Sequence, residues 1–210
     1  MLVFRSVEIH EKKVIDKIVA LHIQSFEGFF LSSLHPGFLR QLYKSFVTHK
    51  KSDLIVAEEG EEAVGFIAYS SDTTDAYRHM LRRYFFPFVW YSFLSFLKKP
   101  SIFFKMLSAL NMPYLHKRGE PYVKVFSIGV DPRYQKHGVG SQLIDEMKKH
   151  VDFSKVKYIT LETDAVDNER ANNFYTKTGF KLSSQIITFE GRKMNKYHYR
   201  VQDNNENNAS

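Results

Sequence analysis

Residues 126–150 read FSIGVDPRYQKHGVGSQLIDEMKKH and pass from a strand through a loop into an amphipathic helix. Gly138 and Gly140 stand where this helix is expected to begin, and without a Cβ they let a bulky anion approach the backbone amides. The first turn of a helix has unpaired N–H groups and lies at the positive end of the helix dipole. The stretch therefore predicts a phosphate-binding turn.

Polar side chains around the two glycines support this interpretation. Arg133, Lys136 and His137 add positive charge, and the amide of Gln135 can donate a hydrogen bond to a phosphate oxygen. The stretch matches neither the G-x-G-x-x-G pattern of dinucleotide-binding folds nor the Gly-Lys-Ser/Thr of P-loops. Because the pattern is short, two glycines that only form a tight strand–helix turn are the alternative interpretation.

Strands and helices alternate on both sides of this stretch. The predicted strands are Leu2–Ile9, Asp53–Glu58, Ala63–Ser70, Tyr122–Val130, Val156–Thr163, Phe180–Phe189 and Lys193–Val201. The predicted helices are Glu11–Phe26, one that opens at His35-Pro36-Gly37 and continues through Phe46, Gly138–Val151 and Asn168–Thr178. This order predicts a mixed α/β sheet, in which the strands that flank the glycine-rich turn are parallel and joined by a right-handed crossover.

Two motifs resemble one family. The segment VFSIGVDPRYQKHGVGSQLIDEM is similar to the acetyl-CoA motif of the GNAT superfamily of N-acetyltransferases, and NERANNFYTKTGF, from Asn168 to Phe180, resembles the motif that follows it there. The resemblance implies a single GNAT acyl-CoA N-acyltransferase domain over residues 1–202. A helical insertion, residues 72–121, would separate its third and fourth strands, and the polar tail 203–210 would be disordered.

The resemblance also implies a cofactor site. The backbone of Ile128–Val130 would pair with the pantetheine arm of acetyl-CoA, the amides of Lys136–Ser141 would hold its pyrophosphate, and Asn168 would hydrogen-bond the arm, with help from Asn172 or Asn173. The residues assigned to acetyl-CoA are Ile128, Gly129, Val130, Gln135, Lys136, His137, Gly138, Val139, Gly140, Ser141, Asn168, Asn172 and Tyr175. No metal is expected to take part.

Acetyl transfer needs a neutral amine and a proton for the departing thiolate. Tyr175 falls where the family often places this general acid, and a phenol with a pKa of about 10 can protonate a thiolate whose pKa is about 8.5. The alternative is that Tyr175 only packs in the core. Lys124 stands where many relatives carry a glutamate that acts as the general base, so the identity of the general base is left open. The candidates are His35, Glu27, Glu120 and Glu162, or a water chain to one of them, and His35 is the best by its reference pKa although it could simply form a turn.

The insertion is aromatic and basic. Residues 75–118 contain Arg78, Arg82 and Arg83 at helical spacing among Phe, Trp, Leu and Met, and prolines at 87, 100 and 113 are expected to break the stretch into two or three helices. Four roles fit this composition: a subdomain packed on the sheet, a lid over the acceptor, a homodimer contact, or a helix that lies on an anionic membrane.

Composition excludes some classes of protein. The 210 residues include no cysteine, which excludes disulfides and thiolate chemistry, and no signal peptide is visible, so a cytoplasmic location is expected. The net charge of +7 suits an anionic ligand, but no nucleic-acid motif accompanies it. The expected activity is acetyl transfer from acetyl-CoA to a primary amine of a small molecule, such as an amino sugar or amino-acid derivative. The alternatives are a protein N-terminal or lysine acetyltransferase, and a non-catalytic acyl-CoA-binding or membrane-associated module.

Overall fold

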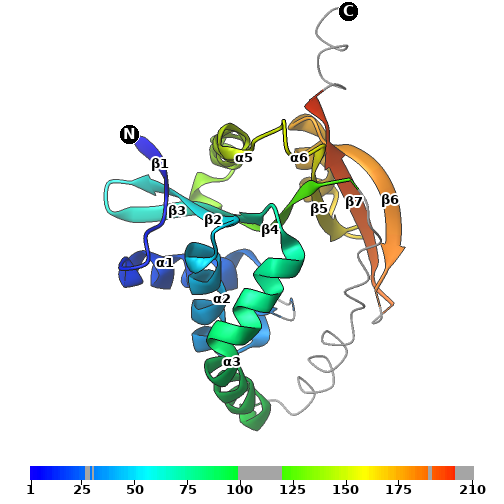
Figure 1. Ribbon diagram of the computed structural model, residues 1–210. Helices are drawn as coiled ribbons and strands as arrows, with labels where there is room; N and C mark the ends of the chain where they lie inside the picture. The colour runs from blue at the N-terminus through cyan, green and yellow to red at the C-terminus, as the bar shows by residue number, and fades with distance from the viewer. Residues whose placement is uncertain (27–28, 30, 99–119, 189–190, 202–210) are drawn as a thin grey trace, which may run out of the picture.

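The computed structural model describes residues 1–26, 29, 31–98, 120–188 and 191–201, and these form one seven-stranded sheet with helices on both faces (Figure 1). The strands are β1 (Leu2–Ser6), β2 (Ser52–Glu59), β3 (Glu62–Ser70), β4 (Tyr122–Val130), β5 (Tyr158–Asp164), β6 (Lys181–Ile187) and β7 (Lys193–Tyr199). The helices are α1 (Lys12–Ser25), α2 (Pro36–Thr48), α3 (Thr73–Lys98), α5 (Val139–His150) and α6 (Glu169–Lys177), with short 3-10 turns η1 (Leu31–Ser33) and η2 (Pro132–Tyr134).

The strand order is β1-β2-β3-β4-β5-β7-β6, and every neighbouring pair is antiparallel except β4 and β5. The mixed sheet, the β2–β3 hairpin and the parallel pair on either side of α5 are confirmed. β1 ends at Ser6 rather than at Ile9, because Val7 makes one last bond to β2 and the amide of Glu8 then turns to the carboxylate of Glu11. The predicted tail, residues 203–210, lies outside the described residues.

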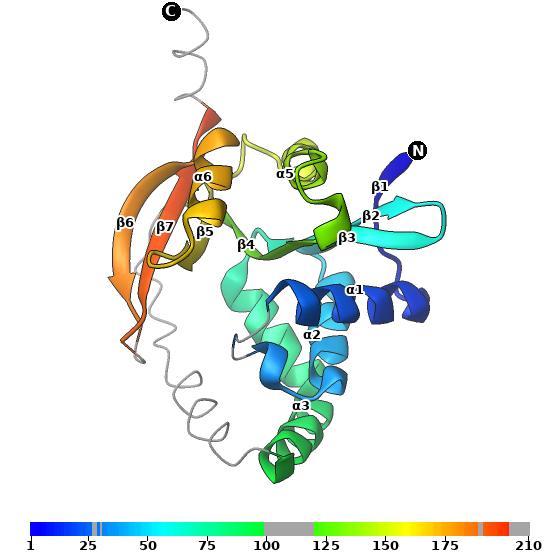
Figure 2. The ribbon, with the colours of Figure 1, turned by 180° about the vertical axis from the view of Figure 1, so that it is seen from behind.

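Two apolar cores lie on opposite faces of the sheet. Helices α5 and α6 cover one face, and α1, α2 and α3 lie on the other (Figures 1 and 2). β3 serves both, since Phe66 packs against α1 and α2 while Ile67, one residue on, packs on the α5 side. The sheet therefore lies between two helical layers, with one apolar core on each of its faces.

α3 is a single helix of 26 residues, and the predicted break at Pro87 is wrong. Pro87 has no N–H to donate to the carbonyl of Arg83, but its fixed φ suits a helix, and packing on α2 holds the segment together. The ring of Phe88 lies 4.6 Å from that of Phe38, and Tyr91 covers Gly37 so closely that a Cβ there would be 2.2 Å from the ring. The predicted breaks at residues 100 and 113, and any further helix in the insertion between α3 and β4, lie outside the described residues.

None of the helices within the described ranges is long and apolar enough to cross a membrane.

Candidate functional site

The central feature of the sheet is that β4 and β5 diverge after a short paired segment. They pair only through Tyr122 with Tyr158, Val123 with Ile159, and Lys124 with Thr160, after which β5 continues beside β7 alone. From Val125 onward, no strand among the described residues pairs with this edge of β4. Its outward backbone N–H and C=O groups are therefore open to an extended ligand that binds as an added strand.

A β-bulge marks the point of separation. Ala68 of β3 pairs with Ser127 and Tyr69 pairs with Val125, so Phe126 is an extra residue in β4. Its ring packs between Phe46 and Tyr77 on the α2 and α3 side, at 4.9 and 5.7 Å. Because a bulge bends its strand and increases its twist, it turns β4 away from β5 and opens the edge that Ile128–Val130 occupy.

The loop after β4 is fixed by a buried carboxylate. Asp131 accepts hydrogen bonds from the backbone N–H of Arg133 at 2.8 Å and from its guanidinium at 2.8 Å, and its own N–H donates to the carbonyl of Val64. The Arg133 side chain holds the pKa of Asp131 below its usual value. Arg133 thus stabilises the loop first, so it contributes less positive charge to an anion than the sequence suggests.

The start of α5 has the geometry of an anion-binding turn. Lys136 and Gly138 have positive φ of 70° and 78°, and the left-handed residues re-aim the successive amides of this turn. Gly138 caps α5 with no side chain, and its carbonyl accepts from Gln142 at 3.0 Å. The N–H groups of residues 139–141 have no acceptor inside the helix. Lys136, His137 and Gly138 are all exposed, so a pyrophosphate can reach this turn.

Gly140 is required for a different reason. A Cβ on it would lie 3.1 Å from the ring of Phe174 in α6, so this glycine lets α5 and α6 pack closely. Gln135 also has a partner within the protein, since its side-chain amide donates to the carbonyl of Val130 at 3.3 Å. One amide hydrogen of Gln135 is still free for an anion.

Two asparagines of the second motif lie at the end of β5. The Asn168 amide donates to Thr163 at 2.7 Å and leaves its oxygen and one hydrogen available. Asn172 donates to the carbonyls of Asp164 and Asn168, and its oxygen accepts from Asn195 and from Tyr197, at 2.7 and 2.9 Å. The donors of Asn172 therefore join α6 to the end of β5 and to its own N-cap, and its oxygen joins α6 to β7. The contact of Asn172 with the cofactor stays a prediction.

Tyr175 lies in the core on the α5 and α6 side, with its ring close to Phe180 at 6.1 Å and to Tyr197 at 5.9 Å. Burial raises the pKa of its phenol well above the usual value. The group is therefore protonated at neutral pH, as an acid must be, but it gives up that proton less readily than an exposed tyrosine.

Among the predicted bases that the structure describes, only Glu162 is near the opening in the sheet. It projects from β5 on the face opposite Tyr175, half-buried, and its carboxylate is 3.1 Å from the ammonium of Lys124. This ion pair follows from the register of the two strands, because the pairing of Lys124 with Thr160 places Glu162, two residues further along β5, within reach of the Lys124 ammonium. Glu120 instead forms an exposed ion pair with Arg200, and Glu27 lies outside the described residues.

His35 is a helix cap in this structure. Its Nδ1 accepts from the N–H of Gly37 at 3.0 Å, its backbone N–H donates to Ser95, and its ring stacks on Tyr91 at 5.1 Å. A neutral histidine has one nitrogen with a free lone pair, and here that nitrogen is already engaged. As a base, His35 would have to release the cap of α2.

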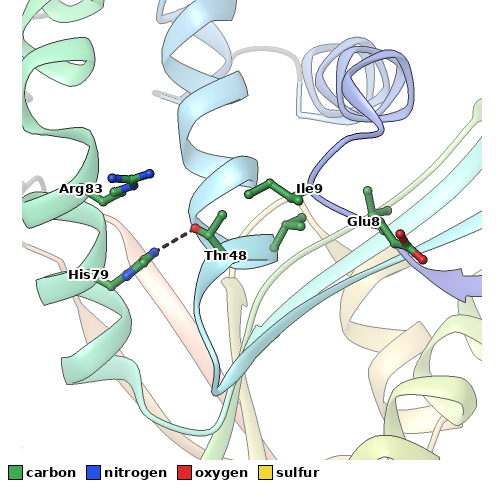
Figure 3. A pocket seen from close by; sticks show the side chains of 7 residues that line it. Glu8, Ile9, Thr48, His79 and Arg83 are labelled. Atoms are coloured by element: carbon green, nitrogen blue, oxygen red, sulfur yellow. Dashed lines mark hydrogen bonds between the residues drawn. The ribbon is translucent and has the colours of Figure 1, made fainter.

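A hollow of about 610 Å³ lies away from these residues, between the turn after β1, the end of α2, and α3 (Figure 3). Its lining is Val7, Glu8, Ile9, Val47, Thr48, His79 and Arg83. His79 and Arg83 extend into it from α3, and His79 bonds the hydroxyl of Thr48 at 2.8 Å. The hollow contains none of the predicted cofactor residues, so the geometry of the β4 edge, and not this cavity, defines the candidate site. No cluster of three or more potential metal ligands occurs among the described residues.

Comparison with known proteins identifies the family of this chain. The model of the Acetyltransferase (GNAT) family matches residues 16–180. A GNAT-family protein from Desulfovibrio desulfuricans is similar in structure, with a TM-score of 0.62, 16% identity, and coverage of 96% of this chain and 99% of that one. NAA60 from Arabidopsis thaliana, solved with acetyl-CoA, has a TM-score of 0.59, 16% identity, and coverage of 96% and 99%.

An N-acetyltransferase from Staphylococcus aureus Mu50 is also similar, with a TM-score of 0.60, 14% identity, and coverage of 95% and 98%. A search of curated protein sequences gave no match. At these identities the solved structures show the shared fold, and the family model covers most of the chain. This chain therefore belongs to the GNAT family of acetyltransferases, which use acetyl-CoA as co-substrate.

Proposed function

We propose that the protein transfers the acetyl group of acetyl-CoA to a primary amine by direct attack within a ternary complex. The observation that carries this proposal is the open edge of β4 from Val125 onward, directly before the anion-binding turn at the start of α5, where residues 136–138 are exposed. An extended arm and a pyrophosphate need these two features side by side. Acetyl-CoA supplies the acyl group as a thioester when it is bound.

The residues on the two sides of the opening divide the proton transfers. Tyr175 is on the α5 and α6 side and holds a proton for the departing thiolate. Glu162 is on the opposite face, toward α1–α3, and accepts the proton that the attacking amine loses, directly or through one water. An outward N–H of the β4 edge near Ile128 polarises the acyl carbonyl.

Lys124 favours amines that are already neutral. Its ammonium lies 3.1 Å from Glu162 and repels a cationic acceptor at the position where proton removal takes place. An α-amino group has a pKa of about 8 and is substantially neutral near that pH, whereas a lysine side chain has a pKa of about 10.4 and is almost entirely cationic. We therefore propose a small molecule with a weakly basic amine, an amino sugar or an amino-acid derivative, as the acceptor.

A protein N-terminus is the second candidate, because its α-amino group meets the same requirement. Two structures of similar fold support keeping it: the NatC complex bound to a Gag peptide and CoA, and the ribosomal-protein-S18-alanine N-acetyltransferase of Escherichia coli, with TM-scores of 0.58 and 0.51. A lysine side chain is less well suited to the Lys124 environment. A non-catalytic acyl-CoA-binding module is the remaining alternative.

The test is a screen for release of free CoA thiol from acetyl-CoA in the presence of amines. Three sets are compared at one pH: amino sugars and amino-acid derivatives, peptides with free N-termini, and peptides that are N-acetylated but carry lysine. Turnover with the first set supports the proposal, and turnover with the second alone selects the protein N-terminus. Tight binding of acetyl-CoA by calorimetry without thiol release from any set would identify a binding module.

A further inference from the structure

Helix α3 is apolar on both of its sides. Its inner side packs on α2 through Phe88 and Tyr91, as described above. Its outer side carries large hydrophobic residues with exposed fractions that reach 80% at Phe86 and 62% at Leu97. These outer residues are Phe85, Phe86, Val89, Trp90, Phe93 and Leu97. A soluble domain rarely exposes so continuous an apolar strip unless something binds there.

Arginines continue this outer strip toward the start of α3. At about 100° per residue, Arg78 falls two turns before Phe85 and Arg82 one turn before Phe86 on the same side of the helix, and Arg83 lies at its border. All three side chains are exposed, and none forms an ion pair with a residue that the structure describes. The outer side of α3 is thus a basic section followed by an aromatic one.

The sequence concentrates the charge of the protein in this region. Residues 76–119 contain 8 of the 30 lysines and arginines and none of the 23 aspartates and glutamates. The remainder of the chain has 22 basic and 23 acidic residues, so it is nearly neutral. The net charge of +7 therefore belongs to the stretch that begins with α3.

We infer that the outer side of α3 binds the surface of an anionic phospholipid bilayer. Arg78 and Arg82 interact with the lipid phosphates, while Phe86, Val89 and Trp90 insert at the level of the headgroups. Each basic residue close to such a surface adds a modest, salt-sensitive attraction, and aromatic insertion supplies the second contribution that stable adsorption needs. Neither contribution uses the acetyl-CoA site.

A second copy of this chain is a less suitable occupant. A two-fold contact through α3 would bring together two helices that each carry three exposed arginines and a single acidic residue, Asp75, which is already paired with His49, so the arginines would mainly face like charges. An anionic bilayer offers both an apolar layer and the opposite charge. The charge distribution therefore selects the lipid surface over the dimer.

Trp90 makes the inference directly measurable. It is the single tryptophan of the chain and lies on the outer side of α3 with an exposed fraction of 59%. On addition of phosphatidylcholine vesicles that contain phosphatidylglycerol, its emission should shift to shorter wavelength, and bromine-labelled acyl chains should quench it. Vesicles of phosphatidylcholine alone should give little change, and added salt should reverse the shift.

Two variants separate the α3 surface from general basicity. The change Arg78→Gln with Arg82→Gln should lower partitioning onto anionic vesicles by roughly tenfold. The control Lys12→Gln with Lys13→Gln removes the same charge from exposed positions on α1 and should leave partitioning within about twofold. Circular dichroism checks that both variants are folded.

Several outcomes would overturn the inference. Trp90 emission that is unchanged by anionic vesicles at low salt excludes a bilayer contact at this surface. An equal shift with neutral vesicles, or an equal loss in the α1 control, shows that the arginines of α3 do not direct binding. A shift that appears with rising protein concentration in the absence of lipid, together with a doubled mass by light scattering, identifies a second copy as the occupant.

Discussion

Position 138 allows the anion-binding turn to be tested with two side chains of the same shape. Gly138 has a φ of 78°, a left-handed conformation that asparagine and aspartate tolerate better than other residues. Both Gly138→Asn and Gly138→Asp should therefore lose a similar, small amount of stability. Only the aspartate adds a negative charge beside the amides of residues 139–141, where the pyrophosphate is predicted to bind.

The magnitude follows from Coulomb's law. Gly138 is exposed, so an effective dielectric constant of about 40, between the values for a protein surface and for water, is appropriate. At a separation of about 6 Å, two unit charges then repel by about 1.4 kcal/mol, which corresponds to about a tenfold loss of affinity. The asparagine variant carries no such repulsion.

Isothermal titration calorimetry with acetyl-CoA measures both dissociation constants. The aspartate variant should bind about ten times more weakly than the asparagine variant at low salt, and the difference should shrink as salt screens the charges. Equal affinities in two variants of equal stability would mean that the pyrophosphate does not approach the start of α5. The two glycines would then only shape a turn.

Four further predictions concern the other residues of the site. Glu162→Gln should lower turnover by about 10²-fold when chemistry limits the rate, with an unchanged dissociation constant for acetyl-CoA, and a change within twofold would exclude it as the base. Tyr175→Phe should lower turnover by about 10²-fold with the same unchanged affinity, and equal turnover would leave the tyrosine as a packing residue. Asn172→Ala should cost about 1–3 kcal/mol in chemical denaturation, because its partners lose their hydrogen bonds, and a stable variant would refute the structural role. For Asp131→Asn, the test is the pH dependence of stability. Because the folded state lowers the pKa of Asp131, the natural protein should be more stable than the variant at neutral pH. This difference should begin to fall below the unfolded pKa of 3.8 and be lost as the pH falls through the lower pKa of the folded state. A difference in the free energy of unfolding that stays constant down to acid pH would contradict the role of the contact between Asp131 and Arg133.

Local pattern was enough to predict the elements that position the candidate site. The strand Tyr122–Val130 has the bounds that hydrophobic pattern predicts, and α5 begins within one residue of its predicted start because two glycines and an amphipathic pattern coincide there. The antiparallel hairpin of β2 and β3 follows from polar turn residues between two apolar runs. These features depend on neighbours in the sequence.

The features that were missed depend on partners far away in the chain. Gly140 also allows Phe174 to pack against α5, and Asn172 also accepts hydrogen bonds from Asn195 and Tyr197. These structural roles come in addition to the predicted contacts with the cofactor, which stay predictions. Pro87 is a further case, since only packing on α2 shows that a helix can continue through it. A residue whose role is set by tertiary contacts has no local signal to reveal it.

The charge of the protein shows why composition alone misleads about the ligand. A net charge of +7 suggests a surface that attracts anionic cofactors, yet residues outside 76–119 carry 22 basic and 23 acidic side chains. The part of the protein that holds β4 and α5 is therefore close to neutral, and we expect the attraction of a pyrophosphate to come from the amides at the start of α5 and from Lys136 and His137 beside them. Three of these excess basic residues, Arg78, Arg82 and Arg83, lie on α3, which is on the opposite face of the sheet from α5 (Figure 1). The protein can then bind acetyl-CoA at the start of α5 and an anionic surface at the outer side of α3 independently, because the two proposed sites share no basic residue.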